Sequence, residues 1–293
     1  MPTLPEDFLS HLKSFLPPSE EKAFLQALQE QPITSIRLNP HKPAQIRQAT
    51  KPVAWSKQGF YLEQRPYFTE DPLFWAGAYY VQEASSMFLE QIIQNISIPN
   101  EAVLLDLSAA PGGKSTHLLS LLPESCLLVS NEIIRNRANI LQENLCRWGR
   151  SNYIVTQSEA SVWGKMQGFF DVILVDAPCS GEGMFRKEEQ ALNQWSLENV
   201  NFCATRQKDI LKNILPALAN GGYLIYSTCT YNPQENEENI AWLIENYDLE
   251  HIEIPIDETW GIRKAKWGYR FFPHLLQGEG FFVACLHKKG QNK

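Results

Sequence analysis

The feature that most restricts the fold of this chain is an alternation of short apolar runs and helical segments from about residue 100 onward. The apolar runs predict five strands, at 103–107, 126–130, 153–156, 169–175 and 223–227. Between them, apolar residues recur every three or four positions, as in the segment 134–149, which predicts helices. Strands separated by helices form a parallel sheet with helices on both faces. We therefore predict an α/β fold with a doubly wound, mostly parallel, Rossmann-like sheet.

The first 75 residues have a different pattern and predict a small α+β domain. Apolar positions near Phe8 and Phe24 predict two short helices, and the segments 34–39 and 53–62 predict short strands. Residues 76–93 again show helical spacing. We divide the chain into an N-terminal lead-in domain, 1–75, and a larger domain, 76–293.

Composition excludes several classes of protein. With 44% hydrophobic and 20% charged residues, the 293-residue chain is typical of a globular protein and not of a disordered one. We expect no membrane span and no secretory signal, because no apolar stretch is long enough and the N-terminus lacks the basic and apolar segments of a signal. The six cysteines include no C-x-x-C pair, which favours a reduced cytoplasmic protein. The net charge of −7, taken alone, argues against a nucleic-acid partner.

A loop of small residues, Asp106-Leu-Ser-Ala-Ala-Pro-Gly-Gly-Lys114, follows the first strand of the larger domain, where ligands bind in this fold. It contains no dinucleotide motif G-x-G-x-x-G. A phosphate loop fits at its end, but Ser108 stands where the first glycine is needed and Pro111 interrupts the loop. Glu132 ends the next strand, where an acid can bind a ribose diol. These features favour S-adenosylmethionine over ATP as the ligand. The alternatives are that the loop is a glycine-rich turn that serves packing alone and that Glu132 is a solvated acid without a ligand.

Two further loops each place a cysteine after a predicted strand. The Pro-Cys loop, 176–187, begins Asp176-Ala-Pro-Cys179, and the Thr-Cys loop, 227–236, begins Ser227-Thr-Cys229. The two strands are neighbours in a doubly wound sheet, so we expect both cysteines to face one crevice. The remaining cysteines are expected to be small apolar core residues, the commonest role of the residue; they are Cys126, Cys146, Cys203 and Cys285.

Two thiols beside a carboxylate suit methylation of carbon 5 of a pyrimidine. That carbon is too weak a nucleophile to take a methyl group from a sulfonium unless a thiolate first adds at carbon 6. A carboxyl group near ring N3 and the exocyclic amine can stabilise the developing charge. A base must then remove the proton from carbon 5 so that the thiolate can leave. Asp176, Cys179 and Cys229 match these three needs.

Taken together and in this order, the three loops closely resemble those of the Sun/Nop2-type RNA cytosine-C5 methyltransferases, and most closely the bacterial 16S rRNA methyltransferase F group. The resemblance extends to Tyr79–Met87 upstream and Gly278–Ala284 downstream, so it covers most of the chain. It implies an S-adenosylmethionine-dependent methyltransferase sheet in 76–293 and an RNA-binding role for 1–75.

The resemblance also assigns roles to individual residues. It implies that Cys229 is the nucleophile, that Cys179 assists proton removal and release, and that Asp176 orients the cytosine. Family members with both cysteines act on RNA, whereas DNA cytosine methyltransferases use only the Pro-Cys cysteine. The residues that the resemblance assigns to the cofactor are Ser108, Ala109, Ala110, Pro111, Gly112, Gly113, Lys114, Glu132, Glu159 and Asp176.

Two local basic segments offset the acidic total. The segment 263–274 carries basic residues interleaved with aromatic ones and no acid, which suits phosphates and unstacked bases. The pair Arg186-Lys187 follows the Pro-Cys loop cysteine closely. The alternative interpretation of both basic segments is that they are ordinary solvated surface. We predict RNA contacts by Arg186, Lys187, Arg263, Lys266 and Arg270.

The sequence therefore predicts a cytoplasmic, monomeric RNA cytosine-C5 methyltransferase with no metal and no membrane partner. Its expected substrate is 16S rRNA or the small ribosomal subunit, and tRNA is the second choice of substrate. A P-loop-like ATPase and an inactive RNA-binding module are two competing hypotheses for the function. Relatives commonly continue with a further RNA-binding region, so we expect this chain to be a short form or a truncated one.

Overall fold

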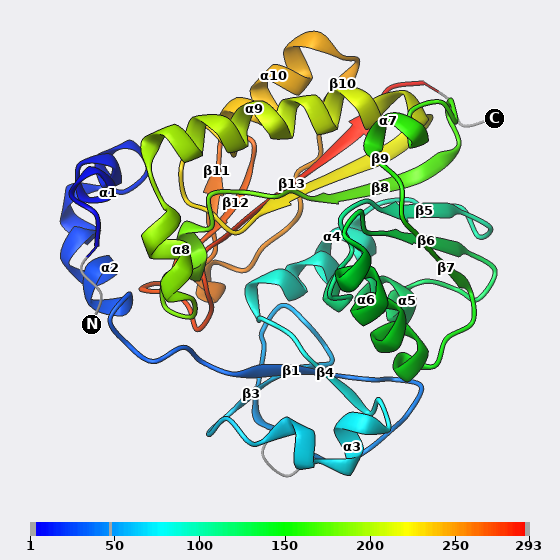
Figure 1. Cartoon of the computed structure of the whole chain (residues 1–293), viewed down its shortest axis with the longest axis horizontal. Coiled ribbons are helices and arrows are strands. Elements are labelled where there is room, and N and C mark those ends of the chain that lie inside the picture. Colours follow the sequence, from blue (N-terminus) through cyan, green and yellow to red (C-terminus); the bar gives the residue numbers. More distant parts are fainter. Residues whose placement is uncertain (1–3, 47–48, 291–293) are drawn as a thin grey trace.

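The computed structural model describes residues 4–46 and 49–290, which form a large α/β sheet with a smaller antiparallel sheet beside it (Figure 1). The predicted fold class is confirmed. Within the described residues the large sheet has nine strands in the order β11-β12-β13-β9-β8-β5-β6-β7, with β10 pairing to β13. Its strands are β5 (Val103–Asp106), β6 (Leu127–Asn131), β7 (Tyr153–Thr156), β8 (Phe170–Asp176), β9 (Leu218–Thr228), β10 (Leu249–His251), β11 (Arg263–Ala265), β12 (Gly268–Phe271) and β13 (Phe281–Lys288).

The five strands predicted from the apolar runs are all present and run parallel to one another. β8 and β9 are neighbours, with Asp176 opposite Ser227 at their carboxyl ends. This register places the Pro-Cys and Thr-Cys loops side by side. β10 to β13 form an antiparallel extension that hydrophobic periodicity alone did not predict. β11 and β12 form a tight hairpin, whereas β13 pairs with β9 and β10 from more distant parts of the chain.

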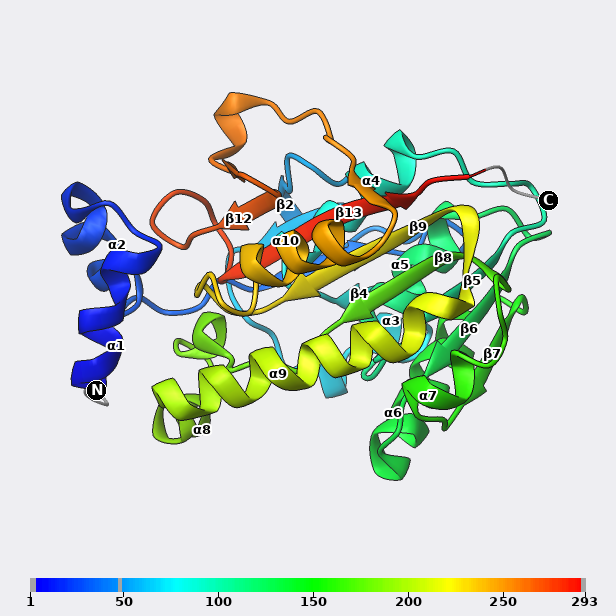
Figure 2. The same ribbon diagram turned by 90° about the horizontal axis from the view of Figure 1, so that it is seen from above.

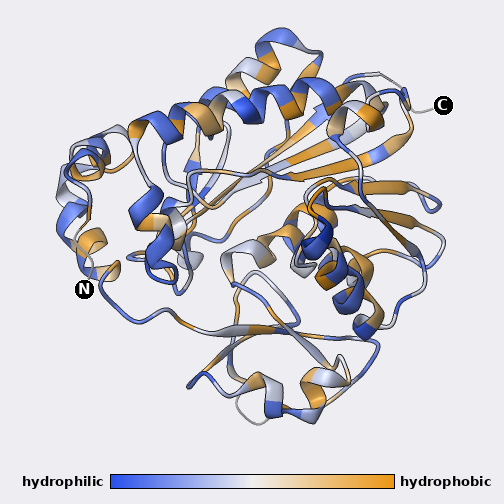
Figure 3. Ribbon diagram, in the orientation of Figure 1, coloured by the Kyte–Doolittle hydropathy of each residue, from blue (hydrophilic) through white to orange (hydrophobic). Residues whose placement is uncertain are grey.

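Helices cover both faces of the large sheet, as Figures 1 and 2 show. One face carries α4 (Leu89–Asn95), α5 (Gly113–Leu121) and α6 (Arg135–Trp148), and their apolar side chains share a buried cluster with Leu104 and Leu128 of the sheet. The other face carries α7 (Ala160–Trp163), α9 (Leu197–Ile214) and α10 (Glu237–Asn246), in a second cluster with Ile173 and Leu224. Figure 3 shows the central strands as mainly hydrophobic between these amphipathic helices, the pattern expected of strands buried on both sides. No helix within 4–46 and 49–290 is long and apolar enough to cross a membrane.

The small sheet has the order β2-β3-β1-β4, and its strands are β2 (Ala49–Pro52), β3 (Gly59–Leu62), β1 (Ser35–Leu38) and β4 (Tyr79–Val81). The helix suggested for 76–93 is wrong at its start, because Tyr79–Val81 pairs with β1 and α4 begins only at Leu89. Pairing to an existing strand overrides the local helical spacing of these residues. α3 (Pro72–Trp75) lies beside the small sheet.

The two N-terminal helices, α1 (Glu6–His11) and α2 (Glu21–Ala27), pack against the larger domain. Phe8 and Phe24 share a buried cluster with Phe185, which follows the Pro-Cys loop cysteine, and with Tyr231 of the Thr-Cys loop. The segment 4–27 therefore supports the two cysteine loops from outside the large sheet. α8 (Glu189–Gln194) contributes Leu192 to the same cluster.

Arg37 of β1 joins the small sheet to the large one. Its guanidinium is fully buried and donates hydrogen bonds to Gln82 Oε1 (2.7 Å) and to Thr116 Oγ1 of α5 (2.7 Å). It also lies over the ring of Trp148, 4.5 Å from the centroid. Burial lowers the pKa of Arg37 to about 9. A cation buried in this way fixes the relative position of the two sheets, because moving them apart would leave its donors without acceptors.

Candidate functional site

The two predicted cysteines meet at the carboxyl ends of β8 and β9. Cys179 Sγ lies 3.2 Å from Cys229 Sγ, within hydrogen-bond range for sulfur. The hydrogen bond with Cys229, together with burial and the charge of Glu235, raises the pKa of the Cys179 thiol well above its usual value. Cys179 is therefore the sulfur that keeps its proton.

Asp176 links this pair to the loop after β5. Its Oδ2 accepts a hydrogen bond from Lys114 Nζ (2.7 Å), and its Oδ1 accepts one from Ser227 Oγ (2.7 Å). Burial opposes the charge of Lys114, but the carboxylate of Asp176 outweighs burial and raises the pKa of the ammonium above its usual value. An anchored carboxylate and a cation thus stand together beside the thiols.

Two buried glutamates connect the Pro-Cys and Thr-Cys loops to each other through hydrogen bonds. Glu182, from the first loop, accepts hydrogen bonds at Oε2 from Thr230 Oγ1 (2.7 Å), from the amide of Tyr231 (2.8 Å) and from the amide of Asn232 (3.0 Å). Its Oε1 accepts from Trp195 Nε1 (2.9 Å) and from Asn232 Nδ2 (3.2 Å). One carboxylate thus satisfies five donors, most of them in the other loop.

Glu235 makes the reciprocal connection. It belongs to the Thr-Cys loop and accepts from the amide of Ser180 (3.0 Å) in the Pro-Cys loop, and from Gln207 Nε2 of α9 (2.6 Å). Burial raises its pKa. The segment Asn232-Pro-Gln-Glu235 has the pattern of a helix start, and Asn232 does accept the amide of Glu235 (2.9 Å). α10 nevertheless begins only at Glu237, so Asn232 shapes a turn in the site and not a helix start.

Gly183 permits the close approach of these loops. Its amide donates to the carbonyl of Cys229 (2.9 Å). A Cβ at this position would lie 2.3 Å from the carbonyl oxygen of Gly280 and 2.9 Å from that of Cys229. Any side chain here would displace the backbone of Cys229.

A cleft of about 180 Å³ lies between the loop after β5 and the segment that follows β4. Of the residues predicted to bind the cofactor, seven line it: Ser108, Ala109, Ala110, Pro111, Gly113, Lys114 and Asp176. Tyr80, Val81, Gln82, Glu83 and Ser86 form the opposite wall. We call this space the cofactor cleft. It borders Asp176 and Lys114, and so connects to the thiol pair.

Asp106 also lines the cofactor cleft and was not among the predicted site residues. Its Oδ2 accepts from Ser115 Oγ (2.7 Å), whereas its buried Oδ1 has no hydrogen-bond partner among the described residues. Burial raises the pKa of this carboxyl to about 7. A buried oxygen that faces a cleft without a partner is suited to receive a donor from a ligand.

The remaining predicted cofactor residues lie outside the lining of the cleft. Gly112, with φ +112°, begins α5 in a backbone conformation that favours glycine. Glu132 is buried and is not a solvated acid: it accepts the amide of Ile134 (3.0 Å) and pairs with Arg137 (3.4 Å). Its Oε2 accepts no hydrogen bond from the part of the chain that is described. Glu159 is exposed at the start of α7, after the neighbouring strand end.

The residues predicted to contact RNA fall into two groups. Arg186 and Arg270 are mostly buried in ion pairs, with Glu279 (2.8 Å) and with Glu237 respectively, which leaves little of either guanidinium for a phosphate. The other three lie nearer the surface: Lys187 is exposed, Lys266 is exposed over the ring of Trp267, and Arg263 is half-buried against Glu20 (2.7 Å).

Some of the site residues that sequence reasoning missed carried a usable signal, and others carried none. Glu182 and Glu235 belong to the Pro-Cys and Thr-Cys loops. An acid in a loop made largely of glycines and small residues could have indicated that its carboxylate accepts hydrogen bonds within the site. Arg37 and Gln82 had no such sign, since their roles depend on the docking of two sheets that are distant in sequence. Within the described ranges, no group of three or more His, Cys, Asp or Glu residues is arranged to hold a metal ion.

Comparison with known proteins gives consistent similarities. Residues 93–287 match the family described as 16S rRNA methyltransferase RsmB/F, and residues 4–84 match the N-terminal domain of 16S rRNA methyltransferase RsmF. Ribosomal RNA small subunit methyltransferase F of Pectobacterium atrosepticum is 35% identical over 98% of this chain, and that of Escherichia coli O139:H28 is 34% identical over 97%. The chain spans 63% of the length of each of these relatives.

Solved structures agree with the fold. A methyltransferase homolog from Pyrococcus horikoshii superimposes with a TM-score of 0.81 at 27% identity, over 97% of this chain and 95% of that one. The structure of NSun6 from Pyrococcus horikoshii with SFG gives a TM-score of 0.83 at 20% identity, over 98% of this chain and 99% of that one. At 20% identity, the similarity to NSun6 shows only that the fold is shared.

Proposed function

The chain belongs to the 16S rRNA methyltransferase RsmB/F family, and from this premise we propose that it methylates carbon 5 of a cytosine in 16S rRNA, with S-adenosylmethionine as the methyl donor. The observation that carries the proposal is the pair of sulfurs 3.2 Å apart beside the Asp176–Lys114 ion pair. Two thiols and a carboxylate are the groups that an addition–elimination at a pyrimidine ring requires.

The residues around the cofactor cleft fit S-adenosylmethionine better than ATP. Asp106 Oδ1 and Glu132 Oε2 are buried oxygens that accept no hydrogen bond from the described residues, although Glu132 Oε2 lies 3.4 Å from Arg137, and both are suited to hydroxyl or ammonium donors of the cofactor. Lys114, the residue that would serve a phosphate in a P-loop, is held by Asp176. When bound, the cofactor supplies an electrophilic methyl group on a sulfonium.

The reaction begins with Cys229. Its thiolate adds to carbon 6 of the cytosine, and the electron density that this addition supplies makes carbon 5 nucleophilic. Asp176, fixed by Ser227 and Lys114, orients the base by accepting a hydrogen bond from its exocyclic amine. The Lys114 ammonium stabilises the negative charge that develops on the ring. A bond would form between carbon 5 and the methyl carbon while the bond from that carbon to the sulfonium sulfur breaks, its electron pair remaining on the sulfur of a neutral thioether.

Cys179 completes the reaction. Once Cys229 is bonded to carbon 6 it carries no charge, so the part of the increase in the pKa of Cys179 that Cys229 causes is removed, while burial and Glu235 still raise this pKa. Cys179 can then give its proton to solvent and take the proton from carbon 5. The electron pair left behind restores the double bond between carbons 5 and 6 and expels the thiolate of Cys229. The base gains one methyl group and loses one proton.

The test uses labelled S-adenosylmethionine and 16S rRNA. We expect methylation by the wild type, none by Cys229→Ala, and an accumulated protein–RNA adduct with Cys179→Ala, because release is blocked after attack. Cys146→Ala is the matched control and should behave as the wild type. The prediction that Cys146 is a core residue is wrong, because it lies exposed on α6. Full activity of Cys229→Ala would refute the assignment of the nucleophile.

The competing hypotheses separate in the same assay. Methylation of tRNA in place of 16S rRNA would redirect the substrate and keep the chemistry. ATP binding without S-adenosylmethionine binding would favour a P-loop-like ATPase. RNA binding without methyl transfer would favour an inactive binding module.

A further inference from the structure

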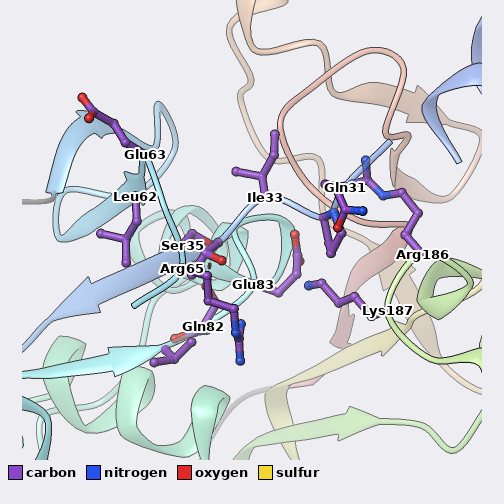
Figure 4. Close-up of a pocket in the computed structure, with 13 residues that line it drawn as sticks. Gln31, Ile33, Ser35, Leu62, Glu63, Arg65, Gln82, Glu83, Arg186 and Lys187 are labelled. Atoms are coloured by element: carbon purple, nitrogen blue, oxygen red, sulfur yellow. Dashed lines mark hydrogen bonds between the residues drawn. The ribbon is translucent and has the colours of Figure 1, made fainter. Parts of the chain in front are cut away.

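A groove of about 780 Å³ separates the small sheet from the end of the Pro-Cys loop (Figure 4). Ser35 of β1 and Arg65 belong to one wall, and Arg186 and Lys187 belong to the other. Val81, Gln82 and Glu83 line both this groove and the cofactor cleft, so the two spaces are adjacent. We call this space the strand groove. It lies beside the place where a target base must meet the cofactor.

Exposed cations stand on both walls of the strand groove. Arg65 and Lys187 are exposed, and Figure 4 shows Lys187 extending toward Glu83. The Lys187 ammonium lies 3.5 Å from Glu279 Oε1, a carboxylate that also pairs with Arg186, so this wall carries two cations for one acid. The carboxylate of Glu83 is already occupied, because it accepts the amides of Ser86 (3.1 Å) and Glu279 (2.9 Å). The exposed acid of the groove, Glu63, points away from it in Figure 4. The groove thus offers a positive charge on each side to a phosphodiester chain.

Aromatic side chains continue the surface beyond Arg65. Tyr67 is 81% exposed and Trp75 is 58% exposed, unusual values for side chains of this size. The Arg65 guanidinium lies over the ring of Phe68, 5.3 Å from its centroid. A cleft of about 250 Å³ shares Arg65 and Val81 with the strand groove. We call Arg65, Tyr67 and Trp75 the aromatic rim.

Arg147 extends this arrangement from the other domain. Its guanidinium lies 4.1 Å from the ring centroid of Phe74 and 5.6 Å from that of Trp75. The Trp75 indole is further fixed by its hydrogen bond to the carbonyl of Thr69 (2.9 Å). Fixed aromatic rings and guanidinium planes are the surfaces on which unpaired bases stack.

We propose that the strand groove and the aromatic rim bind the unpaired nucleotides that flank the target cytosine, with phosphates on Arg65 and Lys187 and a base stacked on Tyr67 or Trp75. The proposal rests on the proposed function for the identity of the RNA. It commits to single-stranded RNA because cations line both walls, aromatic faces are exposed at one end, and the groove lies next to the cofactor cleft. A flipped cytosine must bring its neighbouring nucleotides to this opening.

The test measures RNA affinity and methylation separately. The variants are Arg65→Ala and the double variant Tyr67→Ala/Trp75→Ala. Matched controls are Arg206→Ala and Phe202→Ala, which change an exposed arginine and an exposed phenylalanine on α9, on the opposite side of the large sheet (Figure 1). The probe is a fluorescently labelled 16S rRNA fragment with unpaired flanks, compared with the same target cytosine between duplex flanks.

We expect each rim variant to weaken binding of the unpaired-flank RNA about tenfold, since stacking of one base contributes about 1–3 kcal/mol. The KM for this RNA should rise by a similar factor, while the affinity for S-adenosylmethionine stays at the wild-type value. The preference of the wild type for unpaired over duplex flanks should disappear in the double variant.

Affinities equal to those of the two α9 controls would overturn the proposal. A wild type that binds the RNA through the rim but transfers no methyl group would refute the proposed function and leave this site standing. If the wild type methylates the RNA and the rim variants keep the wild-type RNA affinity and KM, the proposed function is supported and the proposed binding site is refuted. Thermal melting of each variant by circular dichroism identifies any loss of folding.

Discussion

Replacing Glu182 by glutamine tests whether the two cysteine loops are held together as the geometry indicates. The carboxylate accepts three hydrogen bonds at Oε2 and two at Oε1, and it is fully buried. An amide has only one acceptor oxygen. If that oxygen faces the Thr230 side, the new NH2 group meets the donors of Trp195 and Asn232. If it faces the other way, three donors lose their acceptor.

The magnitude follows from the smaller of these losses. Asn232 Nδ2 keeps Glu235 Oε1 as an acceptor (2.8 Å), so at least one buried donor, Trp195 Nε1, is left unsatisfied, at about 1–3 kcal/mol. We therefore expect Glu182→Gln to lower the free energy of unfolding by at least about 1–3 kcal/mol. Because the displaced loop carries Cys229, kcat should also fall. The affinity for S-adenosylmethionine should stay near the wild-type value, since other residues line the cofactor cleft.

The assay is urea unfolding followed by far-ultraviolet circular dichroism, together with binding of S-adenosylmethionine at equilibrium. Glu245→Gln, an exposed position on α10, is the matched control and should change the free energy of unfolding by less than about 0.5 kcal/mol. A loss below about 1 kcal/mol for Glu182→Gln would refute the reasoning. It would mean that water or a rearranged loop replaces the carboxylate without cost.

Three further predictions address other parts of the site. The folded chain holds the pKa of Asp106 at about 7 against an ordinary 3.8, so the wild type binds a proton that the unfolded chain lacks and loses stability as pH rises from about 4 to 7. Asp106→Asn should remove up to about 4 kcal/mol of this pH dependence of unfolding, and parallel curves for the two proteins would contradict it. Gly183→Ala should lower kcat at least tenfold, since its Cβ would meet the backbone of Gly280 and of Cys229; an unchanged kcat would contradict this. Arg37→Met should speed hydrogen exchange in β1 and β4 but not in α9, and Arg37→Lys should have a smaller effect; unchanged exchange in β1 would show that the cation does not join the sheets.

Much of the fold could be predicted because its cause is local. Apolar runs of five to seven residues between amphipathic segments are stable only as strands covered on both faces, and that requirement dictated the parallel sheet and its helices. The order of polar loops along the chain then placed Cys179 and Cys229 at neighbouring strand ends. Their side chains do meet, at 3.2 Å. The sequence also contained the motifs from which the family could be identified.

The remaining features depend on contacts between segments that are far apart in the sequence. The strand Tyr79–Val81 exists because β1 offers it a partner, against its helical spacing. Arg186 and Arg270 look like surface cations in the sequence, but distant carboxylates draw them into buried ion pairs.

The sequence by itself determined the five parallel strands and the polar loops at their ends, because hydrophobic periodicity and loop residues act over a few positions. Only the tertiary structure decided which charged side chains are exposed to a ligand and which are buried in ion pairs or hydrogen bonds within the protein. The physical reason is that the burial of a charge depends on partners brought from elsewhere in the chain. Glu182 and Arg37 are on the internal side of that division, and Arg65 and Lys187 are on the exposed side.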